Sequence, residues 1–119
     1  MPFKAILTEL VQSVPGATGA ILADWEGEAV EHSALHDDFE LKVVGAHKGI
    51  ILNQMKDLQS KLSGDPVRDA IVTTAHQHVI VGAVGKDYSL VMTLVREAIP
   101  ARALFRFRQT VELLAKEIY

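Results

Sequence analysis

Two almost unbroken apolar runs separated by a short turn constrain the fold of this chain more than any other feature. The runs cover residues 78–84 and 88–95, and Gly85, Lys86 and Asp87 between them are typical turn residues. A strand with one face in water alternates apolar and polar residues, so both strands are expected to be covered on both faces. Their short connection makes them antiparallel. We therefore expect an antiparallel sheet with a layer of helices on each side.

Three helices are predicted around this sheet. Apolar residues at three- and four-residue steps predict helices over residues 2–14 and 100–118. The central helix has the clearest boundaries, because Asp37 can cap its start and Gly64 suits its end. Between these residues the helix would be about 37 Å long at 1.5 Å per residue. A seven-residue strand is only about 23 Å long, so this helix should extend beyond its own sheet.

Three further strands complete the sheet. They are predicted over residues 17–23, 28–35 and 68–75. The charges of Glu28 and Glu31 suggest that the second of them lies at an edge. The order helix, two strands, helix, three strands, helix predicts an α+β fold, a three-layer α/β/α sandwich with a five-stranded antiparallel sheet. The sequence contains neither a linker nor an internal repeat, so we expect a single domain over residues 1–119.

Composition and charge exclude several classes of protein. The chain has no cysteine, which excludes disulfide scaffolds, thiol catalysis and iron–sulfur sites. Its formal charge of −3 argues against a general nucleic-acid binder. No stretch is apolar enough to span a bilayer, and the start of the chain lacks the basic and apolar regions of a signal peptide. We expect a cytoplasmic protein that does not insert into membranes.

No constellation of catalytic or ligand residues stands out. His76 and His78 are spaced as metal ligands on one strand can be, but no nearby carboxylate completes a site. They are interpreted as solvated residues of a turn. We predict no catalytic residues, no cofactor and no metal site.

Two features indicate that the chain binds a second copy of itself. The central helix carries two apolar stripes, of which only one can face its own sheet. The segment 71–75 has neither charge nor proline, so it would lack protection against strand pairing if it lay at an edge; the alternative is an interior strand. Pairing across a two-fold axis would cover both surfaces. The predicted dimer contacts are Val44, Ile51, Met55, Ile71, Val72, Thr73 and Thr74.

Polar residues of the central helix border its second stripe and form a candidate surface for another protein. The predicted partner-binding residues are His47, Lys48, Gln54 and Gln59. The alternative is an ordinary solvated helix face.

Arginines are concentrated around the start of the last predicted helix. They are Arg96, Arg102, Arg106 and Arg108, and Glu97 is the only acid of that span. Cations are disfavoured near a helix start. An acidic partner or a phosphate is one explanation, and solvated or ion-paired arginines are the other.

Three segments resemble one family. Residues 15–30, PGATGAILADWEGEAV, are similar to the opening signature of the roadblock-type dynein light chains and their prokaryotic relatives, a P-G-A-x-G-A strand followed by a D-x-x-G hairpin. Residues 88–91 resemble the late strand of that family, and residues 104–108 and 112–117 resemble its last helix. Trp25 departs from the small or polar residues usual in the turn.

The resemblance implies a roadblock/profilin-like fold and a homodimer, in which edge strands pair and central helices lie side by side. It also implies a non-enzymatic platform for a small Ras-like GTPase. Prokaryotic mutual-gliding regulators of this group bind such a GTPase and stimulate its hydrolysis, mainly through the central-helix side of the dimer. Two alternatives remain open: a structural adaptor in a larger complex without effect on GTP hydrolysis, and a small-ligand sensor.

Overall fold

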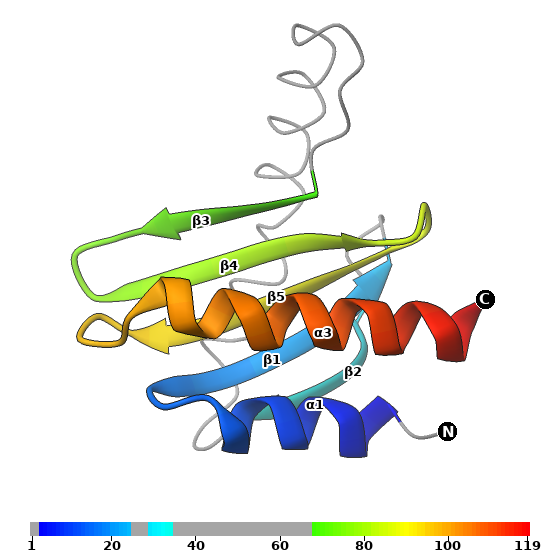
Figure 1. Ribbon diagram of the computed structural model, residues 1–119, viewed down its shortest axis with the longest axis horizontal. Helices are drawn as coiled ribbons and strands as arrows, with labels where there is room; N and C mark the ends of the chain where they lie inside the picture. Colours follow the sequence, from blue (N-terminus) through cyan, green and yellow to red (C-terminus); the bar gives the residue numbers. More distant parts are fainter. Residues whose placement is uncertain (1–2, 25–28, 35–67) are drawn as a thin grey trace, which may run out of the picture.

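The computed structural model describes residues 3–24, 29–34 and 68–119 (Figure 1). Its elements are α1 (Phe3–Ser13), β1 (Ala17–Asp24), β2 (Ala29–Ala34), β3 (Asp69–Thr73), β4 (Gln77–Val84), β5 (Tyr88–Val95) and α3 (Pro100–Ile118). The predicted bounds of β5 and α3 are confirmed. The predicted central helix, and with it the predicted third layer, lies outside the described residues, as does Trp25.

The five strands form one antiparallel sheet in the order β2-β1-β5-β4-β3. The predicted edge position of β2 is confirmed, and β3 is the opposite edge. The interior strands β4 and β5 are buried along most of their length, as their unbroken apolar runs predict. Strand β1 is interior as well, between β2 and β5.

Helices α1 and α3 lie side by side on one face of the sheet and run in opposite directions (Figure 1). Phe107 of α3 and Leu7 of α1 are fully buried in the core between the helices and the sheet. Gly82 of β4 permits this packing, because a Cβ atom there would lie 2.6 Å from Cε1 of Phe107. The helix-bearing face is thus built from the predicted apolar stripes of both helices.

The opposite face of the sheet is also apolar and withdrawn from solvent. Its buried residues are Ile21, Val79, Val81 and Val91, and Ala34, Ala70 and Val72 pack against them. Burial of this second cluster agrees with strands that are covered on both faces.

Strand β3 is shorter than the predicted span of residues 68–75. The hydroxyl oxygen of Thr74 accepts hydrogen bonds from the backbone N–H groups of His76 (3.3 Å) and Gln77 (3.1 Å). This side-chain turn takes the backbone out of the extended conformation. The strand therefore ends at Thr73, and Thr74 lies in the turn that follows.

Candidate functional site

Strand β3 presents one row of backbone groups away from the sheet. Thr74 donates its N–H to the carbonyl of Gln77 (2.9 Å), and Ala83 donates to the carbonyl of Arg68 (3.1 Å). In an antiparallel ladder every second residue is bonded to the neighbouring strand, and the residues between turn their N–H and C=O groups outward. Asp69, Ile71 and Thr73 are those outward residues. Among the described residues, no backbone hydrogen bond outside the β3–β4 ladder is made by the N–H or C=O groups of these three residues.

The side chains of β3 leave this edge open. Ile71 is 40% exposed, and Thr73 is exposed as well. Asp69, the strand's one charged residue, is turned toward α3, where both of its carboxylate oxygens accept hydrogen bonds from Arg108 (2.9 and 3.1 Å). Proline, bulges and exposed charges are the usual protections of an edge strand. Among the described residues β3 carries none of them at its outer side.

Arg108 and Asp69 form a bidentate ion pair between α3 and β3. The hydrogen bonds that Arg108 donates to the carboxylate of Asp69, together with the negative charge of that carboxylate, raise the pKa of the Arg108 guanidinium above its ordinary value. This ion pair joins β3 to α3. It also neutralises the charge of Asp69, which would otherwise oppose the pairing of β3 with another strand.

His78 fixes the end of β3. It is only 5% exposed and bonds through both ring nitrogens, Nδ1 to the hydroxyl of Thr73 (2.8 Å) and Nε2 to the carbonyl of Arg96 (2.9 Å). A carbonyl only accepts, so Nε2 carries a proton; in the neutral ring Nδ1 then accepts from Thr73. The interpretation of His78 as a solvated turn residue is wrong, because the residue lies inside β4 opposite Thr73. His76 is in the turn and exposed, as expected.

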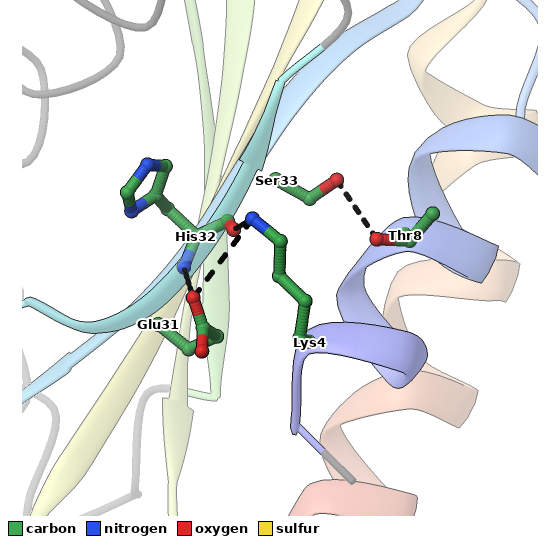
Figure 2. A network of polar contacts seen from close by, with 5 residues as sticks. All are labelled: Lys4, Thr8, Glu31, His32 and Ser33. Atoms are coloured by element: carbon green, nitrogen blue, oxygen red, sulfur yellow. Dashed lines mark hydrogen bonds and ion pairs between the residues drawn. The ribbon is translucent and has the colours of Figure 1, made fainter.

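The opposite edge, β2, differs in its backbone. Lys4 of α1 donates through Nζ to the carbonyl of His32, and the N–H of His32 donates to the carboxylate of Glu31 (3.1 Å) (Figure 2). Nζ of Lys4 also lies 3.9 Å from that carboxylate. Thr8 and Ser33 share a further hydrogen bond of 3.1 Å between α1 and β2 (Figure 2). Side chains therefore occupy polar backbone groups of β2 that an incoming strand would need.

The predicted dimer residues of the edge strand lie together. Ile71, Val72 and Thr73 belong to β3, and Thr74 follows directly. The residues predicted on the central helix lie outside the described residues. They are the dimer contacts Val44, Ile51 and Met55 and the partner-binding residues His47, Lys48, Gln54 and Gln59.

The arginines around α3 have different neighbours. Arg108 bonds Asp69, Arg106 bonds Gln109 (3.2 Å) and Ser13 of α1 (3.3 Å), and Arg102 lines a hollow of about 290 Å³ at the start of α3. Glu97 lines the same hollow. An ion pair within the chain thus accounts for Arg108, in agreement with the second of the two explanations for these arginines.

The outward backbone groups of β3 are suited to bind another strand. Three outward pairs of N–H and C=O groups on a strand of unbroken register can accept a further strand. In the parts of the chain that the structure describes, no three His, Asp or Glu side chains converge as metal ligands. No helix in those parts is long and apolar enough to cross a membrane.

Comparison with known proteins identifies the type of domain. The profile of the Roadblock/LC7 domain family matches residues 4–94, which is most of the chain. No curated protein sequence matches significantly.

Solved structures share the fold at low sequence identity. The Roadblock/LC7 domain from Streptomyces avermitilis has a TM-score of 0.86 and 21% identity, over 97% of this chain and 96% of that one. MglB from Myxococcus xanthus also has a TM-score of 0.86, with 14% identity over 99% and 95% of the two chains. Profilin IA from Acanthamoeba castellanii has a TM-score of 0.68 and 13% identity, over 98% and 99%. The predicted roadblock/profilin-like fold is confirmed.

Proposed function

Because the chain belongs to the Roadblock/LC7 domain family, we propose that it is a non-enzymatic homodimeric regulator that binds a small Ras-like GTPase and modulates its GTP hydrolysis. The resemblance to mutual-gliding regulators supports the GTPase as the partner. The dimer is supported by an observation on the chain itself, the open edge of β3.

The open edge carries the proposal. A strand with outward N–H and C=O groups at Asp69, Ile71 and Thr73, whose one charged side chain is paired with Arg108, is suited to pair with its own copy. Antiparallel pairing of two β3 strands about a two-fold axis would join the two sheets into one continuous sheet. In this dimer Ile71 of each copy would be covered by the other, which removes an apolar side chain from water.

The same two-fold axis would bring the central helices of the two copies together. Val44, Ile51 and Met55 are the proposed contacts there. His47, Lys48, Gln54 and Gln59 are proposed to face the GTPase, so that the partner surface exists in full only in the dimer.

The dimer is tested by Ile71→Pro. The N–H of Ile71 points outward, so proline removes a donor from the outer row without removing a bond of the β3–β4 ladder. We expect a monomer by size-exclusion chromatography with light scattering, where the unaltered chain is a dimer. The matched control is His32→Pro at β2, whose N–H also lies outside the ladder; it should remain dimeric. An unaltered chain that is monomeric, or a dimeric Ile71→Pro variant, would contradict the proposed dimer.

The GTPase is tested by a pull-down from native lysate with the tagged chain. The experiment is run with GDP and with a non-hydrolysable GTP analogue, and bound proteins are identified by mass spectrometry. We expect a small GTPase enriched with the analogue, and its hydrolysis rate is then measured with and without the chain. Lys48→Glu should weaken this interaction, whereas Lys116→Glu, an exposed change on α3, should leave it unchanged.

A set of partners that is independent of nucleotide and contains no GTPase would contradict the regulator. It would favour the structural adaptor, which uses the same dimer without any effect on hydrolysis.

A further inference from the structure

The outer side of β2 is occupied by side chains of the chain itself. Lys4 reaches from the first turn of α1 to the carbonyl of His32, and Glu31 folds back onto the N–H of the same residue (Figure 2). Both polar groups of one residue at the edge are therefore bonded. A strand that paired with β2 in register would have to displace both side chains.

The two side chains are placed so that they can be displaced. The side chain of Lys4 is 57% exposed and that of Glu31 is 35% exposed, so neither is part of the core. Their nitrogen and oxygen lie 3.9 Å apart, and each is hydrogen-bonded to His32. We call this arrangement the Lys4–Glu31 latch.

A bulge adjoins the latch. In the β1–β2 ladder Leu22 pairs with Glu31 and Ala23 pairs with Ala29, so Val30 between them has no partner on β1. A bulge bends its strand and increases the local twist, which makes a straight neighbouring strand fit poorly. The latch and the bulge lie next to each other at the same edge, whereas the β3–β4 ladder has an unbroken register.

We propose that the Lys4–Glu31 latch closes the β2 edge against a second copy of this chain, so that strand pairing between copies is confined to β3. A sheet with one open edge forms a closed pair of two copies. A sheet with two open edges can pair at both, so that copies join alternately through β3 and through β2. The length of such an assembly increases with protein concentration. The confinement to a pair rests on the proposed β3 dimer, but closure of β2 does not.

The test removes the latch in two backgrounds. Lys4→Ala with Glu31→Ala (K4A/E31A) removes both latch side chains without adding a large apolar group. The control is Lys116→Ala with Glu117→Ala, which removes one exposed cation and one exposed anion from α3 and leaves the net charge equal. Each pair is introduced into the unaltered chain and into the Ile71→Pro variant, and the mass is measured by sedimentation over a wide range of protein concentration.

In the unaltered chain we expect K4A/E31A to form species larger than a dimer, in growing proportion as concentration rises. In the Ile71→Pro background we expect an approximately twofold rise in mass, from monomer to a dimer joined through β2. The control pair should match its parent in both backgrounds. If the unaltered chain proves monomeric, the proposed β3 dimer fails, and K4A/E31A in that chain still tests the latch by its own rise in mass.

Unchanged mass of K4A/E31A in both backgrounds would overturn the proposal. Hydrogen exchange at the amide of His32 keeps the test decisive if the variant is less stable. The latch protects this amide in the parent chain, and in K4A/E31A its exchange should slow as concentration rises, because a paired strand replaces the carboxylate. Exchange that is independent of concentration would also overturn the proposal.

Discussion

The two edge strands of the sheet are held by different groups. At β2, side chains bond the outward N–H and C=O groups of the backbone, whereas at β3 they bond side chains of the strand. At β2, Lys4 and Glu31 bond the carbonyl and the N–H of His32. At β3, the partners Arg108 and His78 hold the side chains of Asp69 and Thr73 and leave the outward backbone groups untouched. Both edges are thus attached to the body of the domain, but among the described residues side chains bond outward backbone groups at β2 and not at β3.

An edge strand can be held in place without its outward backbone groups being blocked. The bonds of β3 come from the inner, helix-bearing side and from the neighbouring strand. They stabilise the strand's position, and the outer row of polar groups stays available. A strand that is held in this way loses less conformational freedom when it pairs, which lowers the cost of binding.

The largest expected effect is at the end of β3. His78→Ala removes two hydrogen bonds and leaves a cavity where a buried ring was, so we expect a loss of about 2 kcal/mol in the free energy of unfolding. Chemical denaturation measures this loss, and dimerisation should weaken with it because Thr73 is released. His76→Ala is the control in the adjacent turn and should change stability by less than about 0.5 kcal/mol. Equal effects of the two substitutions would contradict the role assigned to His78.

A smaller effect is expected at β2. Ser33→Ala removes the hydrogen bond to Thr8 that joins β2 to α1, and we expect a loss of about 1 kcal/mol in the free energy of unfolding. Ser33 does not belong to the latch, so the oligomeric state should stay as in the unaltered chain. A change of mass in sedimentation would show that the attachment of β2 and the closure of its edge are not separable.

The smallest effect is expected away from both edges. Tyr119 donates its hydroxyl to Asp87 in the β4–β5 turn (2.9 Å), and burial of the hydroxyl together with this bond raises the pKa of Tyr119 above its ordinary value of 10.0. A raised folded-state pKa contributes stability below pH 10 that is lost as the pH rises through the folded value. Tyr119→Phe should therefore lower the melting temperature slightly at neutral pH and by less in strong alkali.

The residue is 62% exposed, which keeps the expected effect small. The oligomeric state should not change, since the turn lies at neither edge. A shift of the melting temperature that grows above pH 10 would contradict the expected direction of the pH dependence.

Much of the fold follows from local patterns in the sequence. The steps of apolar residues in α1 and α3, the unbroken runs of β4 and β5 and the turn between them all indicate elements that the structure contains. These patterns suffice because burial on one face or on two determines which residues a helix or strand tolerates. The end of β3 does not follow from them, because a single hydroxyl, that of Thr74, ends the strand within an extended-looking run.

The candidate site could be predicted only in part. The sequence shows that residues 71–75 are uncharged and contain no proline, but their position at an edge depends on strand order, and the sequence also allows an interior position. His78 could have been assigned to the interior because an apolar run follows it directly. The hydrogen-bond partners of His78 could not be predicted, because Arg96 is 18 residues away in the sequence and Thr73 lies opposite His78 only through the register of the β3–β4 ladder.

Periodicity, composition and short motifs are local properties, and they were sufficient to indicate β4, β5, α1, α3, the family and the uncharged segment at residues 71–75. Tertiary structure alone decided which edge is open. Lys4 and His32 are 28 residues apart, and Asp69 and Arg108 are 39 apart. Their contacts exist only because α1 and α3 pack on the same face of the sheet beside opposite edges, and a one-residue shift of register would reverse the faces on which these side chains lie.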